Sequence, residues 1–182
     1  MYLYHYFDKR SGPFRSLTGL PEEEAAILFR RMREERSASF GAQRSDDYLT
    51  KRRKCEETVR NEFIKKGGRP QKMSPHYLTV EHCPWLSSWY EQSDFIKISA
   101  EDIDKSLISF TYGDSMPAFS PLVTDGKEYR RKVYTYEEIL KIIEKYGLPQ
   151  EWNAEGKLGP ERYIEAHLWS DDPVRKYLTS VI

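Results

Sequence analysis

The chain has no long hydrophobic run and only two cysteines. These two features argue against a membrane-spanning protein and against a disulfide-rich one. Of its 182 residues, 38% are hydrophobic, yet no stretch approaches the roughly 18 apolar residues that a membrane-spanning helix needs. The opening residues, MYLYHYFDKR, lack the basic segment followed by an apolar one that marks a secretory signal. Cys55 and Cys83 are too few for a disulfide framework. We therefore expect a cytoplasmic protein that does not enter a membrane.

Common nucleotide, hydrolase and metal motifs are missing as well. The sequence contains no GxGxxG, GxxxxGK[ST] or GxSxG. A metal site would have to be assembled from His76, His82, Cys83 and His167. Because these residues form no CxxC or HxxxH pair, we expect no metal site. The run KKGGR at residues 65–69 has the composition of a phosphate loop. It follows a predicted helix C-terminus, however, where the helix dipole repels anions, so its glycines are interpreted as a helix cap.

Strand-forming residues recur with a period of two in several short segments, and the length suits one domain with a buried core. The densest stretch is 76–115. The predicted strands are Tyr2–Phe7, His76–His82, Phe95–Ile98, Leu107–Gly113 and Arg162–Trp169, with a short sixth strand at Arg131–Tyr134.

Three segments carry the apolar stripe and the end signals of helices. They are Pro21–Glu35, Asp46–Lys66 and Tyr136–Tyr146, with Ser37–Ser45 interrupting the pattern between the first two. The third has the clearest start, because Thr135 and Glu138 fit a capping box. The sequence thus predicts a single α+β domain over residues 1–182, with a mixed or mainly antiparallel sheet of five or six strands and about three helices.

The last predicted strand carries the most suggestive side chains. Ile164, Ala166 and Leu168 occupy one face, so Glu165, His167 and Trp169 must project together from the other. A carboxylate beside an imidazole is a common acid–base pair, which makes Glu165 and His167 candidate catalytic residues. The alternative is a solvent-exposed strand face with no chemical role.

Net charge is zero, but the charge is unevenly distributed along the chain. Residues 30–72 hold 14 Lys and Arg against 7 Asp and Glu, whereas residues 81–128 hold 9 acids against 3 lysines. The second helix is predicted to carry four consecutive basic residues on its outward side, Lys51, Arg52, Arg53 and Lys54. They suggest a binding module for nucleic acid or an acidic protein. The alternative is an ordinary solvated helix.

Two segments resemble strands of the ADP-ribosyltransferase superfamily. Leu3-Tyr4-His5-Tyr6 is similar to its first core strand, and Tyr163-Ile164-Glu165-Ala166-His167-Leu168 is similar to its late strand with the catalytic glutamate. The resemblance implies that His5 binds the ribose of NAD, that Glu165 is catalytic, and that Tyr77 or Tyr112 stacks on nicotinamide. The whole chain also resembles small uncharacterised bacterial proteins that share FIKKGG, SFTYGD and YIEAHLW.

These observations leave three hypotheses open. The first is an NAD-consuming transferase, which requires the first and last strands to lie side by side so that His5 and Glu165 line one cleft. The second is the non-catalytic module with a basic helix, and the third is a domain with neither role. A histidine among aromatic residues, such as His5, is also typical of a hydrogen-bonded core residue.

Overall fold

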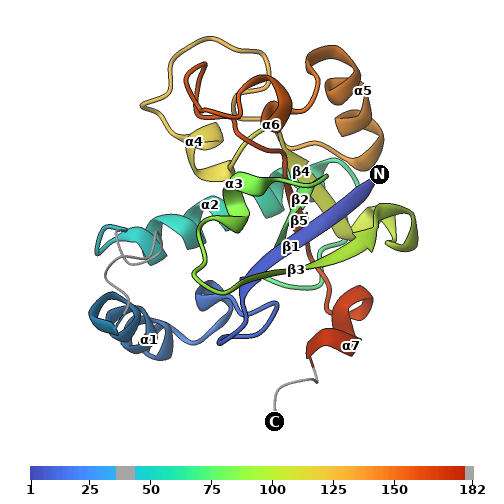
Figure 1. The fold of residues 1–182 in the computed structure, drawn as a ribbon. Coiled ribbons are helices and arrows are strands. Elements are labelled where there is room, and N and C mark those ends of the chain that lie inside the picture. Colours follow the sequence, from blue (N-terminus) through green and yellow to red (C-terminus); the bar gives the residue numbers. More distant parts are fainter. Residues whose placement is uncertain (36–43, 179–182) are drawn as a thin grey trace.

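A five-stranded antiparallel sheet forms the centre of the molecule (Figure 1), in a computed structural model that describes residues 1–35 and 44–178. The strand order is β3-β1-β2-β5-β4, and every neighbouring pair is antiparallel. The strands are β1 Tyr2–Asp8, β2 His76–Val80, β3 Ser93–Ser99, β4 Ile108–Thr111 and β5 Glu165–Leu168. The α+β class and the mainly antiparallel sheet predicted from the sequence are confirmed.

All five longer predicted strands are present, with ends shifted by a few residues. The predicted sixth strand, Arg131–Tyr134, is reduced to a single bridge between Phe110 and Tyr134. Arg131 has a φ of 57°, a left-handed conformation that interrupts an extended strand.

The three predicted helices are confirmed with nearly the predicted bounds, as α1 Glu22–Glu35, α2 Tyr48–Lys65 and α5 Tyr136–Tyr146. The predicted break at Ser37–Ser45 lies outside the described residues, apart from its last two positions. Shorter helices are α3 Pro84–Ser87, α4 Ser115–Phe119, α6 Pro149–Trp152 and α7 Arg175–Leu178. Single 3-10 turns occur at Leu17–Gly19, Ala100–Asp102, Lys105–Leu107 and Asp172–Val174.

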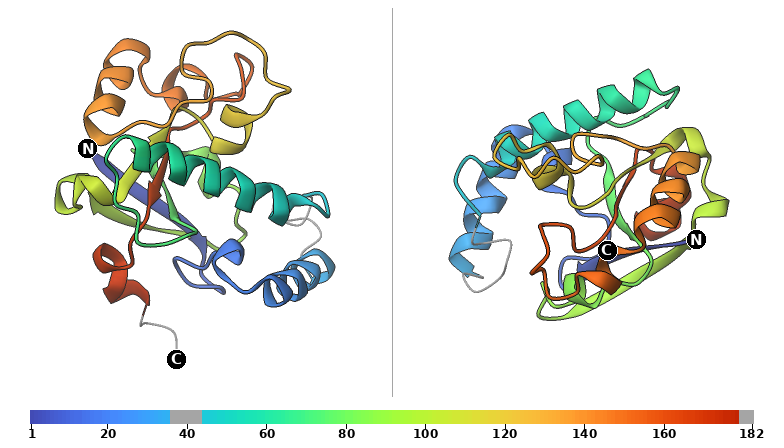
Figure 2. Two further views of the ribbon diagram at one scale, coloured as in Figure 1. Left: turned by 180° about the vertical axis from the view of Figure 1, so that it is seen from behind. Right: turned by 90° about the horizontal axis from the view of Figure 1, so that it is seen from above.

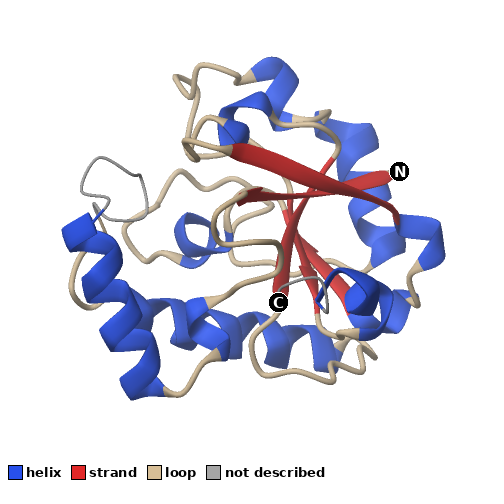
Figure 3. Ribbon diagram, turned by 60° about the horizontal axis from the view of Figure 1, so that its bottom comes forward, coloured by secondary structure: helices blue, strands red, loops and turns tan. Residues whose placement is uncertain are grey.

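The sheet separates two interior layers. Seen from behind, α2 runs across the sheet (Figure 2), and its Val59 and Phe63 pack with Trp169. The other layer is the main apolar core, where Leu3, Leu78, Phe110 and other strand residues meet Ile139 of α5. Figure 3 shows the strands in the middle with helices around them. Both faces of β5 are therefore covered by protein.

The glycines after α2 end this helix, as the sequence predicted. Gly67 has a φ of 88°, and the amide of Gly68 donates to the carbonyl oxygen of Phe63 at 3.0 Å. A Cβ at Gly68 would lie 2.5 Å from the ring of Phe63, which is buried. The second glycine is thus required by close packing.

In the two described ranges, no helix is both long and apolar enough to cross a bilayer. Cys55 and Cys83 are free thiols.

We expect Thr135→Ala to lower the free energy of unfolding by about 1 kcal/mol. The Thr135 hydroxyl accepts from the amide of Glu138, whose carboxylate accepts in return from the amide of Thr135 at 2.9 Å. Removing the hydroxyl leaves a helix-end amide without this acceptor. Urea unfolding measures the loss, with the exposed loop variant Thr124→Ala as the control. Equal midpoints for the two variants would contradict the prediction.

Candidate functional site

The second face of β5 is buried beneath α2 and is not exposed to solvent. Glu165 and His167 are 3% and 1% exposed, and Trp169 is fully buried. The inward side of α2 carries Arg52 and Glu56 as well as its apolar residues. The alternative of a solvent-exposed strand face is therefore wrong, and so is the assignment of Arg52 to the outward side of its helix. A buried carboxylate on β5 draws the guanidinium of Arg52 inward.

Glu165 accepts hydrogen bonds from several directions. Its Oε1 accepts from the Ser115 hydroxyl at 2.5 Å and from Nε2 of His167 at 2.9 Å. Its Oε2 accepts from Arg52 at 3.2 Å. Burial alone would raise the pKa of Glu165, but the charge of Arg52 and the bonds from His167 and Ser115 outweigh it and hold the pKa well below its ordinary value. Glu165 is therefore a permanent anion at neutral pH.

Arg52 connects Glu165 to a second carboxyl group, that of Asp114. One guanidinium nitrogen contacts Glu165, and the other lies 3.3 Å from Oδ1 of Asp114 and 3.1 Å from the Ser115 hydroxyl. The hydroxyl of Tyr163 also touches both acids, at 3.2 Å from Asp114 and 3.4 Å from Glu165. We call Arg52, Asp114, Ser115, Tyr163 and Glu165 the Arg52 cluster.

Asp114 differs from Glu165 in its environment. It lies just after β4 as the N-cap of α4, where it accepts from the amide of Met116 at 2.8 Å. Its side chain is 26% exposed, against 4% for that of Glu165. Desolvation and the negative charge of Glu165 raise the pKa of Asp114, and Arg52 opposes this only in part. Two carboxyl groups whose pKa values are pushed in opposite directions are the usual arrangement of an acid–base pair.

Glu56 is a third acid near Arg52, and it is buried. Its carboxylate accepts from the hydroxyl groups of Tyr77 at 2.5 Å and Thr18 at 2.6 Å, and also from Ser74. The guanidinium of Arg52 lies over the ring of Tyr77, 4.1 Å from its centroid. The predicted ligand residue Tyr77 is thus part of the packing around Arg52.

His5 is on the opposite face of the sheet from Glu165. Tyr4 pairs with Thr79, and Thr79 pairs with Glu165, so these three share a face and the neighbouring His5 must point the other way. In addition, β2 lies between β1 and β5. The expectation that the first and last strands lie side by side is therefore wrong, and His5 and Glu165 do not form one cleft.

Both ring nitrogens of His5 are used inside the protein. Nδ1 donates to the carbonyl oxygen of Tyr77 at 2.8 Å, and Nε2 accepts from the amide of Phe14 at 2.7 Å. The imidazole stacks on Phe14 with 4.1 Å between ring centroids. Burial lowers the pKa of His5 to about 4, so the ring is neutral at pH 7. This is the hydrogen-bonded core histidine that was the alternative interpretation.

Tyr112 lies apart from both residues. It is buried in the main apolar core, where its hydroxyl donates to the carbonyl oxygen of Gly147 at 2.8 Å and accepts from Trp152 at 3.2 Å. His5 contacts the backbone of Tyr77, but the side chains of His5 and Tyr77 lie on opposite faces of the sheet and that of Tyr112 lies in the main apolar core. The three side chains therefore do not form one site.

The four basic residues of α2 do not form a continuous surface. Arg52 is buried, and Arg53 donates to the carbonyl oxygen of Leu20 at 2.9 Å. Lys51 and Lys54 are exposed, and Lys51 pairs with Asp47 at 2.6 Å. Binding of nucleic acid or an acidic protein stays a prediction. Two of the four residues, Arg52 and Arg53, bond to groups inside the protein.

Sequence reasoning missed Asp114 and Ser115 as site residues. The signal that could have found them is their place at the C-terminal end of β4, directly after Gly113. Within residues 1–35 and 44–178, no three His, Cys, Asp or Glu side chains are grouped so that they could hold a metal ion.

The fold and the Arg52 cluster define an α+β protein with a buried, charged layer on one side of its sheet. Comparison with known proteins adds no relative: no protein-family model, curated protein or solved structure matches the chain.

Proposed function

We propose that this protein is an enzyme that cleaves or transfers a glycosyl group, with Asp114 as its proton-exchanging carboxyl group and NAD as the first substrate to test. The observation that carries the proposal is the Asp114–Glu165 pair, two carboxyl groups with opposed pKa shifts that share Arg52 and Tyr163. Because one hydroxyl reaches both acids, their nearest oxygens lie no more than about 7 Å apart. Carboxylate pairs that act on glycosidic bonds are about 5 to 9.5 Å apart.

The two acids have different roles. Glu165 is surrounded by donors and screened from solvent, so it positions Arg52 and Ser115 and supplies a fixed negative charge. Asp114 is in contact with solvent, and a raised pKa makes its carboxylate a better base. It would activate a water molecule or an acceptor hydroxyl group, in place of the role that the resemblance gave to Glu165.

The charge of the site suits a reaction in which the sugar becomes positive. Arg52 is paired with three carboxyl groups, those of Glu56, Asp114 and Glu165. Fixed negative charge in a site of low dielectric constant stabilises an oxocarbenium-like transition state.

Two tryptophans lie beside Tyr163, the residue whose hydroxyl reaches both acids. The ring of Trp85 lies 6.2 Å from that of Tyr163, and Trp89 meets Trp85 edge-on at 4.9 Å. Rings beside a carboxylate pair offer apolar surface to the face of a sugar or of nicotinamide.

We expect Asp114→Asn to reduce nicotinamide release from NAD by about 100-fold or more, the usual contribution of a general acid or base. Asparagine also caps helices well, so α4 and the melting temperature should be preserved. Chromatography of the reaction products measures nicotinamide release, and Asp102→Asn, at an exposed site, is the matched control.

The same assay includes a panel of nitrophenyl glycosides. If wild-type protein leaves NAD and every glycoside intact, the proposal is rejected. It is also rejected if Asp114→Asn turns over substrate as fast as Asp102→Asn.

A further inference from the structure

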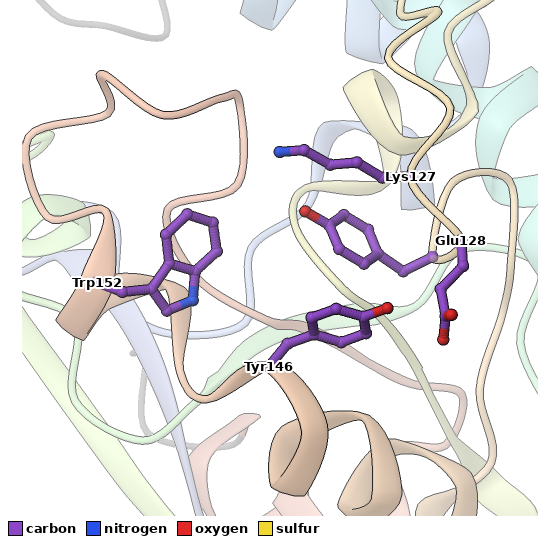
Figure 4. A pocket seen from close by; sticks show the side chains of 5 residues that line it. Lys127, Glu128, Tyr146 and Trp152 are labelled. Carbon is purple, nitrogen blue, oxygen red and sulfur yellow. The ribbon is translucent and has the colours of Figure 1, made fainter.

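A pocket of about 400 Å³ lies apart from the Arg52 cluster, against the main apolar core. Its lining residues are Lys127, Glu128, Tyr129, Tyr146 and Trp152. Figure 4 shows Trp152 and Tyr146 on opposite sides of the gap, with the Lys127 side chain reaching over it. We call it the aromatic pocket. None of its residues belongs to the Arg52 cluster.

The rings of the pocket are held in place from behind. Trp152 donates to the hydroxyl of Tyr112, which donates in turn to the carbonyl oxygen of Gly147 at the end of α5. Tyr129 is buried and meets Tyr146 edge-on, with 5.3 Å between centroids. Rings fixed in this way lose little conformational entropy when a ligand is stacked against them.

A cation is built into the pocket at one end. The ammonium group of Lys127 lies 3.0 Å from Oε2 of Glu161, which is fully buried and also paired with Arg130. The same ammonium group lies 5.7 Å from the ring centroid of Tyr129 and 6.0 Å from that of Trp152. Lys127 thus already takes the place that a ligand cation would have beside Tyr129 and Trp152, and it repels a second positive charge.

The loop at Gly159 leaves room for the contact between Lys127 and Glu161. A Cβ at Gly159 would lie 2.7 Å from Oε2 of Glu161 and 2.9 Å from the Lys127 ammonium group. Asn153 holds the surrounding loop by donating to the carbonyl oxygens of Gly159 and Glu161, at 3.0 and 2.6 Å. The ammonium group is therefore fixed in position by buried contacts.

At the rim, Glu128 adds an acceptor. Its carboxylate is exposed and pairs with Lys145 at 2.7 Å. The pocket thus offers aromatic faces with a donor, Lys127, and an acceptor, Glu128, from adjacent positions of the chain. A ligand that matches all three must be flat, aromatic and able both to accept and to donate hydrogen bonds at its edge.

We propose that the aromatic pocket binds a planar heteroaromatic ring of the nucleobase type, with an exocyclic amino group. The ring stacks between Trp152 and Tyr146, Lys127 donates to a ring nitrogen or carbonyl oxygen, and Glu128 accepts from the amino group. Stacking on aromatic side chains is the general way in which proteins hold unpaired bases. The inference does not depend on the proposed activity of Asp114.

Ligand-observed NMR titration with adenosine tests the inference, with inosine, which lacks the amino group, as the matched ligand. We expect saturable binding that is tighter for adenosine than for inosine. Trp152→Leu should weaken adenosine binding by about tenfold or more. Glu128→Gln, at an exposed site, should remove most of the preference over inosine. Glu144→Gln, an exposed control on α5, and Asp114→Asn should both bind as wild type does.

Three results would overturn the inference. They are no saturable binding of adenosine at millimolar concentration, tighter binding of tetramethylammonium or benzoate than of adenosine, and wild-type discrimination in Glu128→Gln. The second result would indicate a pocket for a simple cation or anion.

Discussion

Replacing Arg52 by methionine should lower the free energy of unfolding by about 3–5 kcal/mol at pH 7. The change leaves Glu165, which is 3% exposed and ionised, without the cation that compensates its charge. Methionine keeps most of the aliphatic bulk of arginine, so the loss reflects charge more than volume. Urea unfolding followed by circular dichroism measures it.

Two further variants separate the charge effect from general damage to α2. Arg53→Met, one residue along, removes a guanidinium bonded to a backbone carbonyl and should cost no more than about 1.5 kcal/mol. Combining Arg52→Met with Glu165→Gln removes both charges and should recover part of the loss, so the two changes should be strongly non-additive. Equal costs for Arg52→Met and Arg53→Met, or simple additivity in the double variant, would show that the pair is not the source of stability.

Acid should weaken the fold in a window set by His5. Burial holds the pKa of His5 at about 4 in the folded protein, against 6.5 ordinarily. Between these values the unfolded chain binds the proton more readily, so stability is complete above pH 6.5 and falls as the pH drops toward 4. The contribution is at most about 3 kcal/mol. Urea midpoints measured from pH 4 to pH 7 report it.

His5→Gln removes the titrating group and can still offer a donor and an acceptor. It should lose this part of the pH dependence, while His82→Gln, at an exposed site, should keep the wild-type profile. Burial also lowers the pKa of His76, so a slope of the same sign remains in both variants. An unchanged profile in His5→Gln would mean that His5 is not the group responsible.

Local patterns in the sequence predicted the elements well, because their causes are local. Period-two alternation predicted the five strands, and the capping box of Thr135 and Glu138 predicted where α5 begins. The same alternation correctly placed Ala166 and Leu168 in the apolar core. Periodicity states which side chains share a face, but it does not state what covers the opposite face.

The candidate site could not be predicted in the same way, since its contacts join distant segments. Arg52 and Glu165 are 113 residues apart, and an arginine in a charge-rich helix normally faces water. Strand order is equally non-local: nothing within β1 or β5 indicates that β2 lies between them. Asp114 was missed because it lies just beyond the predicted strand, which ends at Gly113, and the helix that it caps has only five residues.

The position of β5 has a consequence for synthesis on the ribosome. β5 follows all the other strands in the chain, yet it fills the gap between β2 and β4. A growing chain can join β1, β2 and β3, but β4 has no strand partner until residues 165–168 emerge. Until then the edges of β2 and β4 that β5 later covers stay without a strand partner, and open strand edges are where chains mispair.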